Sequence, residues 1–74
     1  MGQGAAVTLQ QIHRIFEITD RLGIHRESLV IPLGRRSPGG VRRTPGGKIE
    51  VVVDAGDFEV FFSGLEAELL RVTA

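Results

Sequence analysis

The sequence predicts a small α+β domain of the αββα type, with one helix at each end of the chain and an antiparallel sheet of two or three strands between them. Two stripes of apolar residues at helical spacing, one near each end, predict the helices. Alternating apolar residues over 29–33 and 48–54 predict the strands. With 74 residues, the chain has room for one domain, over residues 8–74, near the lower size limit for a self-sufficient core. Residues 1–7 are mostly small and are predicted to be flexible.

The first helix is predicted to begin after Thr8, which is a suitable N-cap and forms a capping box with Gln11. Gly23 suits the left-handed position that ends many helices. Glu17 and Arg21 are spaced to form an ion pair one turn apart. The apolar stripe of this helix consists of Leu9, Ile12, Ile15, Phe16 and Leu22.

The two strands differ in the clarity of their patterns. Residues 29–33 are predicted to form an edge strand, because Pro32 cannot donate a hydrogen bond to a neighbouring strand. In residues 48–54, alternate positions are apolar and share one face: Ile49, Val51 and Val53. Residues 41–43 are candidates for a very short third strand.

Residues 58–62 fit either a helix or a strand. As a helix, this segment would be capped by Asp57 and would continue to the C-terminus. As a strand, it would pair with residues 49–53, and Ser63 would cap a shorter helix. The periodicity favours the helix, which we predict. Its apolar stripe consists of Phe58, Phe61, Phe62, Leu65, Leu69 and Val72.

A repeated unit in the middle of the chain forms a basic loop over residues 34–48. Arg-Arg-Ser-Pro-Gly-Gly is followed, after one valine, by Arg-Arg-Thr-Pro-Gly-Gly. Proline followed by glycine predicts type II turns at residues 37–40 and 44–47. The loop contains no acid and holds five of the nine basic residues of the chain: Arg35, Arg36, Arg42, Arg43 and Lys48.

Two interpretations of the basic loop remain open. The five cations and the backbone N–H groups of consecutive turns suit a phosphate or a nucleic acid. Alternatively, the loop is a solvated hairpin whose charge keeps the protein soluble and prevents sheet edges from associating. No aromatic side chain for stacking of bases lies in the loop, and the formal net charge of the chain is zero.

The predicted sheet needs more cover than two helices supply, since they protect one face only. A second copy of the chain would cover the remaining apolar surface by extending the sheet or by packing against the aromatic helix. We therefore expect a homodimer or a complex with another protein. The candidate interface residues are Phe58, Phe61, Phe62, Leu65 and Val52.

Catalytic and ligand-binding motifs are few. The chain has no cysteine, tyrosine or tryptophan, and neither a phosphate-binding glycine loop nor a nucleophile elbow occurs. His13 and His25 are twelve residues apart without metal-ligand spacing, so we expect neither a metal nor a cofactor. We expect a non-enzymatic protein; in an enzyme, Asp54 or Asp57 would be the acid or base. No apolar run reaches the length of a membrane span, and a cytoplasmic location is the expectation.

In the order and length of its predicted elements, the chain resembles double-stranded-RNA-binding domains. Those domains begin their second helix with a basic cluster that contacts phosphate. Here the corresponding residues are Asp57-Phe58-Glu59-Val60, which are acidic and apolar. The sequence therefore predicts a small interaction or assembly module, with a nucleic-acid or phosphate binder as the alternative.

Overall fold

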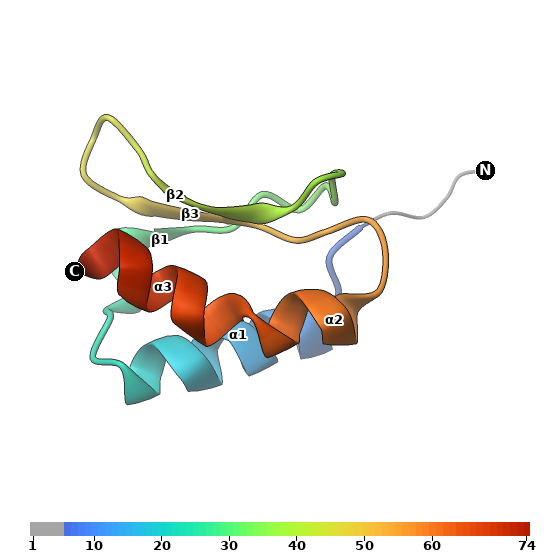
Figure 1. Ribbon diagram of the computed structural model, residues 1–74, viewed down its shortest axis with the longest axis horizontal. Helices are drawn as coiled ribbons and strands as arrows, with labels where there is room; N and C mark the ends of the chain where they lie inside the picture. Colours follow the sequence, from blue (N-terminus) through green and yellow to red (C-terminus); the bar gives the residue numbers. More distant parts are fainter. Residues whose placement is uncertain (1–5) are drawn as a thin grey trace.

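In the computed structural model, which describes residues 6–74, three α-helices lie on one side of a three-stranded sheet (Figure 1). This arrangement confirms the predicted α+β class, with a helix at each end of the described chain. The elements follow in the order α1 (Leu9–Arg21), the 3₁₀ turn η1 (Arg26–Ser28), β1 (Leu29–Val30), β2 (Gly40–Arg43), β3 (Ile49–Val52), α2 (Phe58–Ser63) and α3 (Leu65–Thr73).

The sheet is mixed, with the strand order β1-β3-β2. β2 is antiparallel to β3, as predicted, whereas β1 is parallel to β3. The chain reverses direction once between β1 and β2 and again between β2 and β3. Two reversals return β3 to the direction of β1. β3 therefore pairs in parallel with β1 on one side and antiparallel with β2 on the other.

β1 is shorter than the predicted strand over 29–33. Val30 is in register with Glu50, and the next pairing along these two segments joins Arg36 to Asp54. Between these two pairings the chain after β1 advances by six residues, whereas the chain of β3 advances by four. The two extra residues form a bulge around Pro32, where the chain leaves the hydrogen-bonded ladder.

The N-terminal segment fills the gap beside this bulge. The Val7 N–H donates to the Leu33 carbonyl at 2.7 Å, and Ala6 forms an antiparallel bridge with Gly34. Val7 is buried in the core at 8% exposure. Ala6 and Val7, the last two residues of the segment predicted to be flexible, thus contact the domain, and residues 1–5 lie outside the described part.

The ends of α1 confirm the predicted signals. The Thr8 hydroxyl accepts from the Gln11 N–H at 3.1 Å, and the Gln11 side chain accepts from the Thr8 N–H at 3.0 Å. Gly23 has φ +78°, and the N–H groups of Gly23 and Ile24 bond back to the last turn. The C-terminal end is thus a Schellman motif.

Two details of the predicted α1 surface are wrong. Leu9 is 67% exposed, whereas Ile18 is 5% exposed and belongs to the core. Arg21 forms its ion pair with Glu66 of α3, at 2.9 Å, and not with Glu17. Arg21 pairs with Glu66 because α3 places this carboxylate directly beside the last turn of α1.

The helical alternative for residues 58–62 is confirmed. The Asp57 carboxylate caps α2 by accepting from the N–H groups of Glu59 at 2.8 Å and Val60 at 3.4 Å. Gly64 divides the predicted single helix into α2 and α3. The Gly64 N–H bonds to the Phe61 carbonyl at 3.2 Å, which tightens the last turn of α2.

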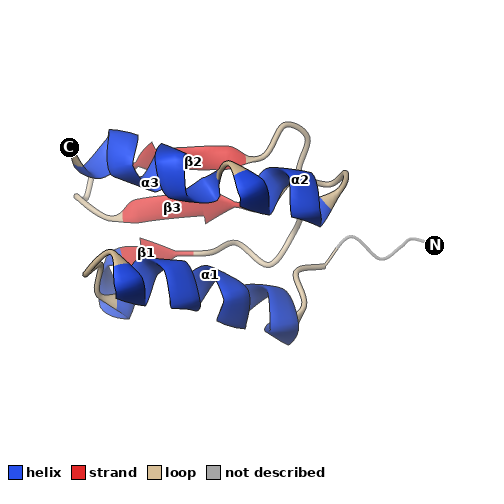
Figure 2. Cartoon of the chain, turned by 60° about the horizontal axis from the view of Figure 1, so that its bottom comes forward, coloured by secondary structure: helices blue, strands red, loops and turns tan. Residues whose placement is uncertain are grey.

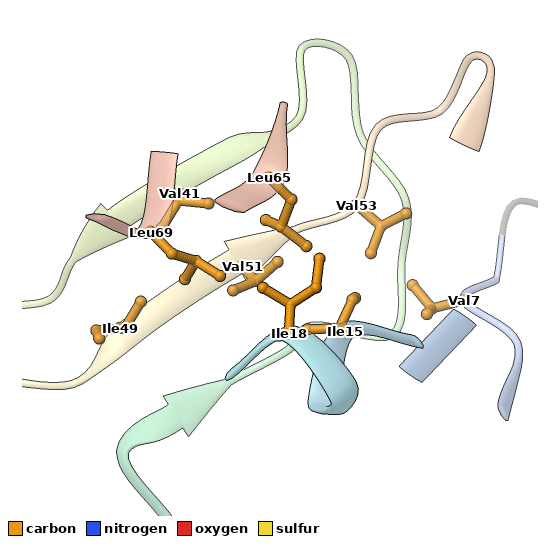
Figure 3. Close-up of a cluster of buried hydrophobic side chains, with 9 residues drawn as sticks. All are labelled: Val7, Ile15, Ile18, Val41, Ile49, Val51, Val53, Leu65 and Leu69. Atoms are coloured by element: carbon orange, nitrogen blue, oxygen red, sulfur yellow. The ribbon is translucent and has the colours of Figure 1, made fainter. Parts of the chain in front are cut away.

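The core lies between the helices and one face of the sheet (Figure 3). It consists of nine buried side chains: Val7, Ile15, Ile18, Val41, Ile49, Val51, Val53, Leu65 and Leu69. Because side chains alternate along a strand, Glu50 and Val52 of β3 point to the opposite face. Val30 of β1 is 37% exposed. The face of the sheet that carries these residues has no helix against it among residues 6–74 (Figure 1).

Candidate functional site

The first half of the basic loop is bound to the turn that follows β3. The Arg35 guanidinium donates to two backbone carbonyls, through Nε to Asp54 at 2.8 Å and through Nη2 to Gly56 at 2.6 Å. The backbone of Arg36 adds two further bonds, from its N–H to the Val53 carbonyl at 3.0 Å and from the Ala55 N–H to its carbonyl at 2.7 Å.

Asp54 is the centre of this junction. Its Oδ1 accepts from the Gly39 N–H and its Oδ2 from the Gly56 N–H, both at 2.7 Å. These two bonds, with a smaller contribution from the charge of Arg35, hold the pKa of the Asp54 carboxyl below its ordinary value. Desolvation acts in the opposite direction and is outweighed. We refer to Arg35, Arg36, Gly39, Asp54 and Gly56 as the Asp54 junction.

Position 39 of the junction must be glycine, because there is no space for a side chain. A Cβ at this position would lie 2.5 Å from the Asp54 backbone nitrogen and 2.6 Å from the Val52 carbonyl oxygen. The predicted type II turn at 37–40 is wrong, because it needs a positive φ at Gly39 and the structure has none there. The close approach to the end of β3, and not the turn type, explains the glycine.

The second turn of the loop also differs from the predicted type II geometry. The Gly47 N–H donates to the Thr44 carbonyl at 2.9 Å, and the positive φ, +85°, falls on Gly47 and not on Gly46. The Thr44 N–H donates to the Lys48 carbonyl at 2.7 Å. This pattern is that of a three-residue hairpin loop closed by a glycine bulge, whose twist suits the antiparallel strands on either side.

The remaining cations of the loop are spread over the surface. Arg42 forms an ion pair with Glu50 at 2.6 Å. Arg43 Nη2 donates to the Val72 carbonyl at 3.0 Å, at the C-terminal end of α3, and Lys48 Nζ donates to the Glu27 carbonyl at 2.8 Å. These groups do not converge on one point, so the loop is not a preformed cradle for a single anion.

The charge of the loop is nevertheless poorly balanced. Among residues 6–74, five of the nine cations form ion pairs with carboxylates. The four that do not are all in the loop: Arg35, Arg36, Arg43 and Lys48. Three of these donate to carbonyls, and the exposed Arg36 side chain has no hydrogen bond within the described residues. The loop therefore keeps a local positive charge in a chain of zero net charge.

The acid and base candidates have structural roles. Both oxygens of Asp54 accept backbone bonds, and its lowered pKa makes it a weak base. Asp57 caps α2, and the Ser63 hydroxyl donates to the Val60 carbonyl at 2.7 Å. His13 and His25 are exposed, and no cluster of three or more metal-ligating side chains occurs within residues 6–74.

Replacing Asp54 with asparagine is expected to lower stability near neutral pH and to remove part of its acid dependence. The pKa of Asp54 is lower in the folded than in the unfolded state. Its carboxylate therefore stabilises the fold fully above the unfolded value, about 3.9, and this stabilisation is lost as the pH falls through the folded value. Urea unfolding at several pH values measures the difference between the two proteins, which should shrink below about pH 4.

The control for this prediction is Glu17→Gln, which removes an exposed carboxylate that has no ion pair within residues 6–74. A difference between Asp54→Asn and the wild type that stays constant from neutral to acidic pH would contradict the role given to the carboxylate.

The predicted partner interface divides into two parts. Phe58, Phe61 and Phe62 are half-buried against the core of their own chain, and Leu65 is inside it at 1% exposure. Val52 alternates with the buried Ile49 and Val51 along β3, so its side chain lies on the uncovered face of the sheet.

Arg14 covers part of the aromatic surface. Its guanidinium lies 4.2 Å from the centre of the Phe62 ring and 5.6 Å from that of Phe58, and it forms an ion pair with Glu59. The aromatic rings are thus largely covered by the core and by Arg14 of the same chain. Val52, in contrast, borders an open hollow. This hollow, of about 270 Å³, is lined by Pro38, Gly39, Gly40, Val41, Arg42 and Val52.

Sequence reasoning placed Val30 with Val52 on the uncovered face but missed the junction role of Asp54. The parallel position of β1, which brings Val30 beside β3, has no signal in the sequence. The Asp54 junction had a partial signal, since an aspartate before Ala-Gly is typical of a turn that uses its carboxylate as acceptor. Its long-range partner Gly39 could be found only from the fold.

Comparison with known proteins finds no matching family model, no matching curated protein and no matching solved structure. Within residues 6–74, no helix combines the length and the apolar character needed to cross a membrane.

Proposed function

We propose that this protein is a small non-enzymatic interaction module that forms a homodimer through the uncovered face of its sheet. The observation that carries the proposal is the one-sided cover of the sheet. Val30 and Val52 are apolar and lie on the face that no helix of the described chain protects.

The charges on this face favour a second copy as the occupant. Arg42 and Glu50 form an ion pair with each other, so the face has no excess charge that would repel an identical face. The zero net charge of the chain removes long-range repulsion between copies. The alternative route to a dimer, through the phenylalanine stripe, is less favoured because those rings already pack on their own core.

The dimer is tested by sedimentation velocity from low to high micromolar concentration. The wild type is expected to shift from monomer to dimer, and Val52→Lys should weaken the association by about tenfold or more, because the dimer would bury an unpaired charge. Val60→Lys places the same charge on an α2 residue that is 70% exposed and should dimerise like the wild type. A wild type that remains monomeric at every concentration would overturn the proposal.

The second candidate is a phosphate or nucleic-acid binder, supported by the four loop cations that lack carboxylate partners within residues 6–74. It is less favoured because Arg35 is committed to the Asp54 junction and the aromatic rings lie on the helices. Anisotropy with labelled DNA and RNA at low and physiological salt separates the two functions. Saturable binding that weakens steeply with salt, and is lost when Arg36, Arg42 and Arg43 become glutamine, would favour the second candidate.

A further inference from the structure

The outer edge of β2 carries backbone groups that the sheet does not use. The Thr44 N–H donates to the Lys48 carbonyl, so residue 44 faces β3 with its hydrogen-bonding groups. In an antiparallel pair these groups alternate between the partner strand and the outside. Gly40 and Arg42 therefore bond to β3, whereas Val41 and Arg43 direct their N–H and C=O groups outward.

The pairing on the other side of β3 agrees with this assignment. The Val53 carbonyl accepts from Arg36, on the side of β1, so odd-numbered residues of β3 face β1 and even-numbered ones face β2. Glu50 and Val52, the register partners of Arg42 and Gly40, are even-numbered.

No strand lies beyond β2 among residues 6–74, and Figure 2 shows β2 as the outermost strand, with α3 against its face. Two N–H and two C=O groups thus line an edge that an added strand can occupy. This edge is distinct from the uncovered face used by the proposed homodimer.

The side chains of the edge indicate the charge of the added strand. Arg42 points to the uncovered face, where it meets Glu50, and Arg43 points to the helical face, where it meets Val72. Two consecutive residues of an added strand would therefore each lie opposite one arginine, and acidic residues fit both places.

A second copy of β2 fits this edge poorly. If two such strands paired antiparallel with Val41 opposite Arg43, the two copies of Arg42 would lie directly opposite each other. Like charges in that position destabilise the pair. This is the register that uses the outward groups of both residues in each copy, so a strand of opposite charge fits the edge better than a second β2.

We propose that the edge of β2 binds an extended acidic segment of a partner protein, added as an antiparallel strand with carboxylates beside Arg42 and Arg43. The proposal goes beyond the homodimer, since it uses the edge and not the face of the sheet. It also gives a role to Arg43, one of the four loop cations without an ion pair among residues 6–74.

Hydrogen exchange by NMR tests the edge directly. In the protein alone, the Arg42 amide should exchange slowly and those of Val41 and Arg43 rapidly. The probe is a short fluorescein-labelled peptide with two central glutamates between threonine and valine residues. At low salt it should bind and slow the exchange of Val41 and Arg43.

Two control peptides separate charge from strand pairing. Glutamine in place of glutamate should weaken binding about tenfold through loss of two cross-strand charge pairs. N-methylation of alternate backbone nitrogens should abolish binding while leaving both carboxylates in place.

A matched pair of variants isolates the backbone contribution. Arg43→Gln removes the charge and keeps the outward N–H. Arg43→Pro removes both, without breaking a bond to β3, since the Arg43 N–H points away from that strand. The proline variant should bind the peptide about fivefold more weakly than the glutamine variant. Circular dichroism confirms that both are folded.

Several outcomes would overturn the proposal. They are slow exchange of Val41 and Arg43 in the protein alone at low concentration, equal binding of the N-methylated peptide, and binding of a single-stranded oligonucleotide without binding of the peptide. Repeating the titration with the monomeric variant Val52→Lys keeps the result independent of the homodimer.

Discussion

Replacing Gly39 with alanine is expected to destabilise the domain by about 2 to 3 kcal/mol, the cost of inserting a methyl group into a closely packed site. The added Cβ would lie within 2.6 Å of the Asp54 backbone and the Val52 carbonyl oxygen. These are backbone atoms, which cannot relieve the overlap by a change of rotamer as a side chain can, so the loop must move away from β3. That movement breaks the 2.7 Å bond from the Gly39 N–H to the Asp54 carboxylate.

Gly40→Ala is the matched control for this prediction. In the described part of the chain, no atom lies within 4 Å of a Cβ built at Gly40, and the φ of Gly40 is not positive, so alanine should be close to neutral. Urea unfolding followed by circular dichroism, at one protein concentration, measures both variants. Equal stability of the two would show that the loop does not pack on the end of β3 as described.

Replacing Leu69 with alanine is expected to cost about 3 kcal/mol, because the substitution removes buried methyl groups and leaves a cavity. Leu69 has 0% exposure and lies in the centre of the core, beside Val41 and Val51 (Figure 3). For a chain of 74 residues, total stability is about 4 to 11 kcal/mol, so this loss is a large fraction of it.

Leu70→Ala provides the same chemical change at the next position of α3, where the side chain is 50% exposed. Its cost should be below about 1 kcal/mol. The measured quantity is the difference in unfolding free energy between the two variants in urea. A Leu70 variant as unstable as the Leu69 variant would mean that α3 presents a different face to the sheet.

The local features of the fold follow from the sequence. The capping box at Thr8, the left-handed Gly23 and the cap at Asp57 were all predicted, because each depends on residues within one or two turns of one another. The choice of a helix for residues 58–62 was correct, since helical spacing outweighed the strand propensity of the phenylalanines.

The candidate site was predicted less completely. The basic loop could be recognised from its repeated arginines, yet the different roles of those arginines could not. Arg35 is held by carbonyls that come 19 and 21 residues later, whereas Arg36 has a side chain without a partner in the described chain. Arg35 and Arg36 are neighbours of the same type, yet only the Arg35 side chain bonds to the turn after β3.

By itself, the sequence determined the fold class, the ends of α1, the start of the C-terminal helical region and the excess positive charge of the loop, since these depend on local spacing and composition. Only the tertiary structure decided that β1 is parallel to β3, that Gly39 packs against β3, and that Val41 and Arg43 form an open edge. Those features arise from contacts between segments distant in the chain, whose register and direction are selected by the common core and have no periodic signal of their own.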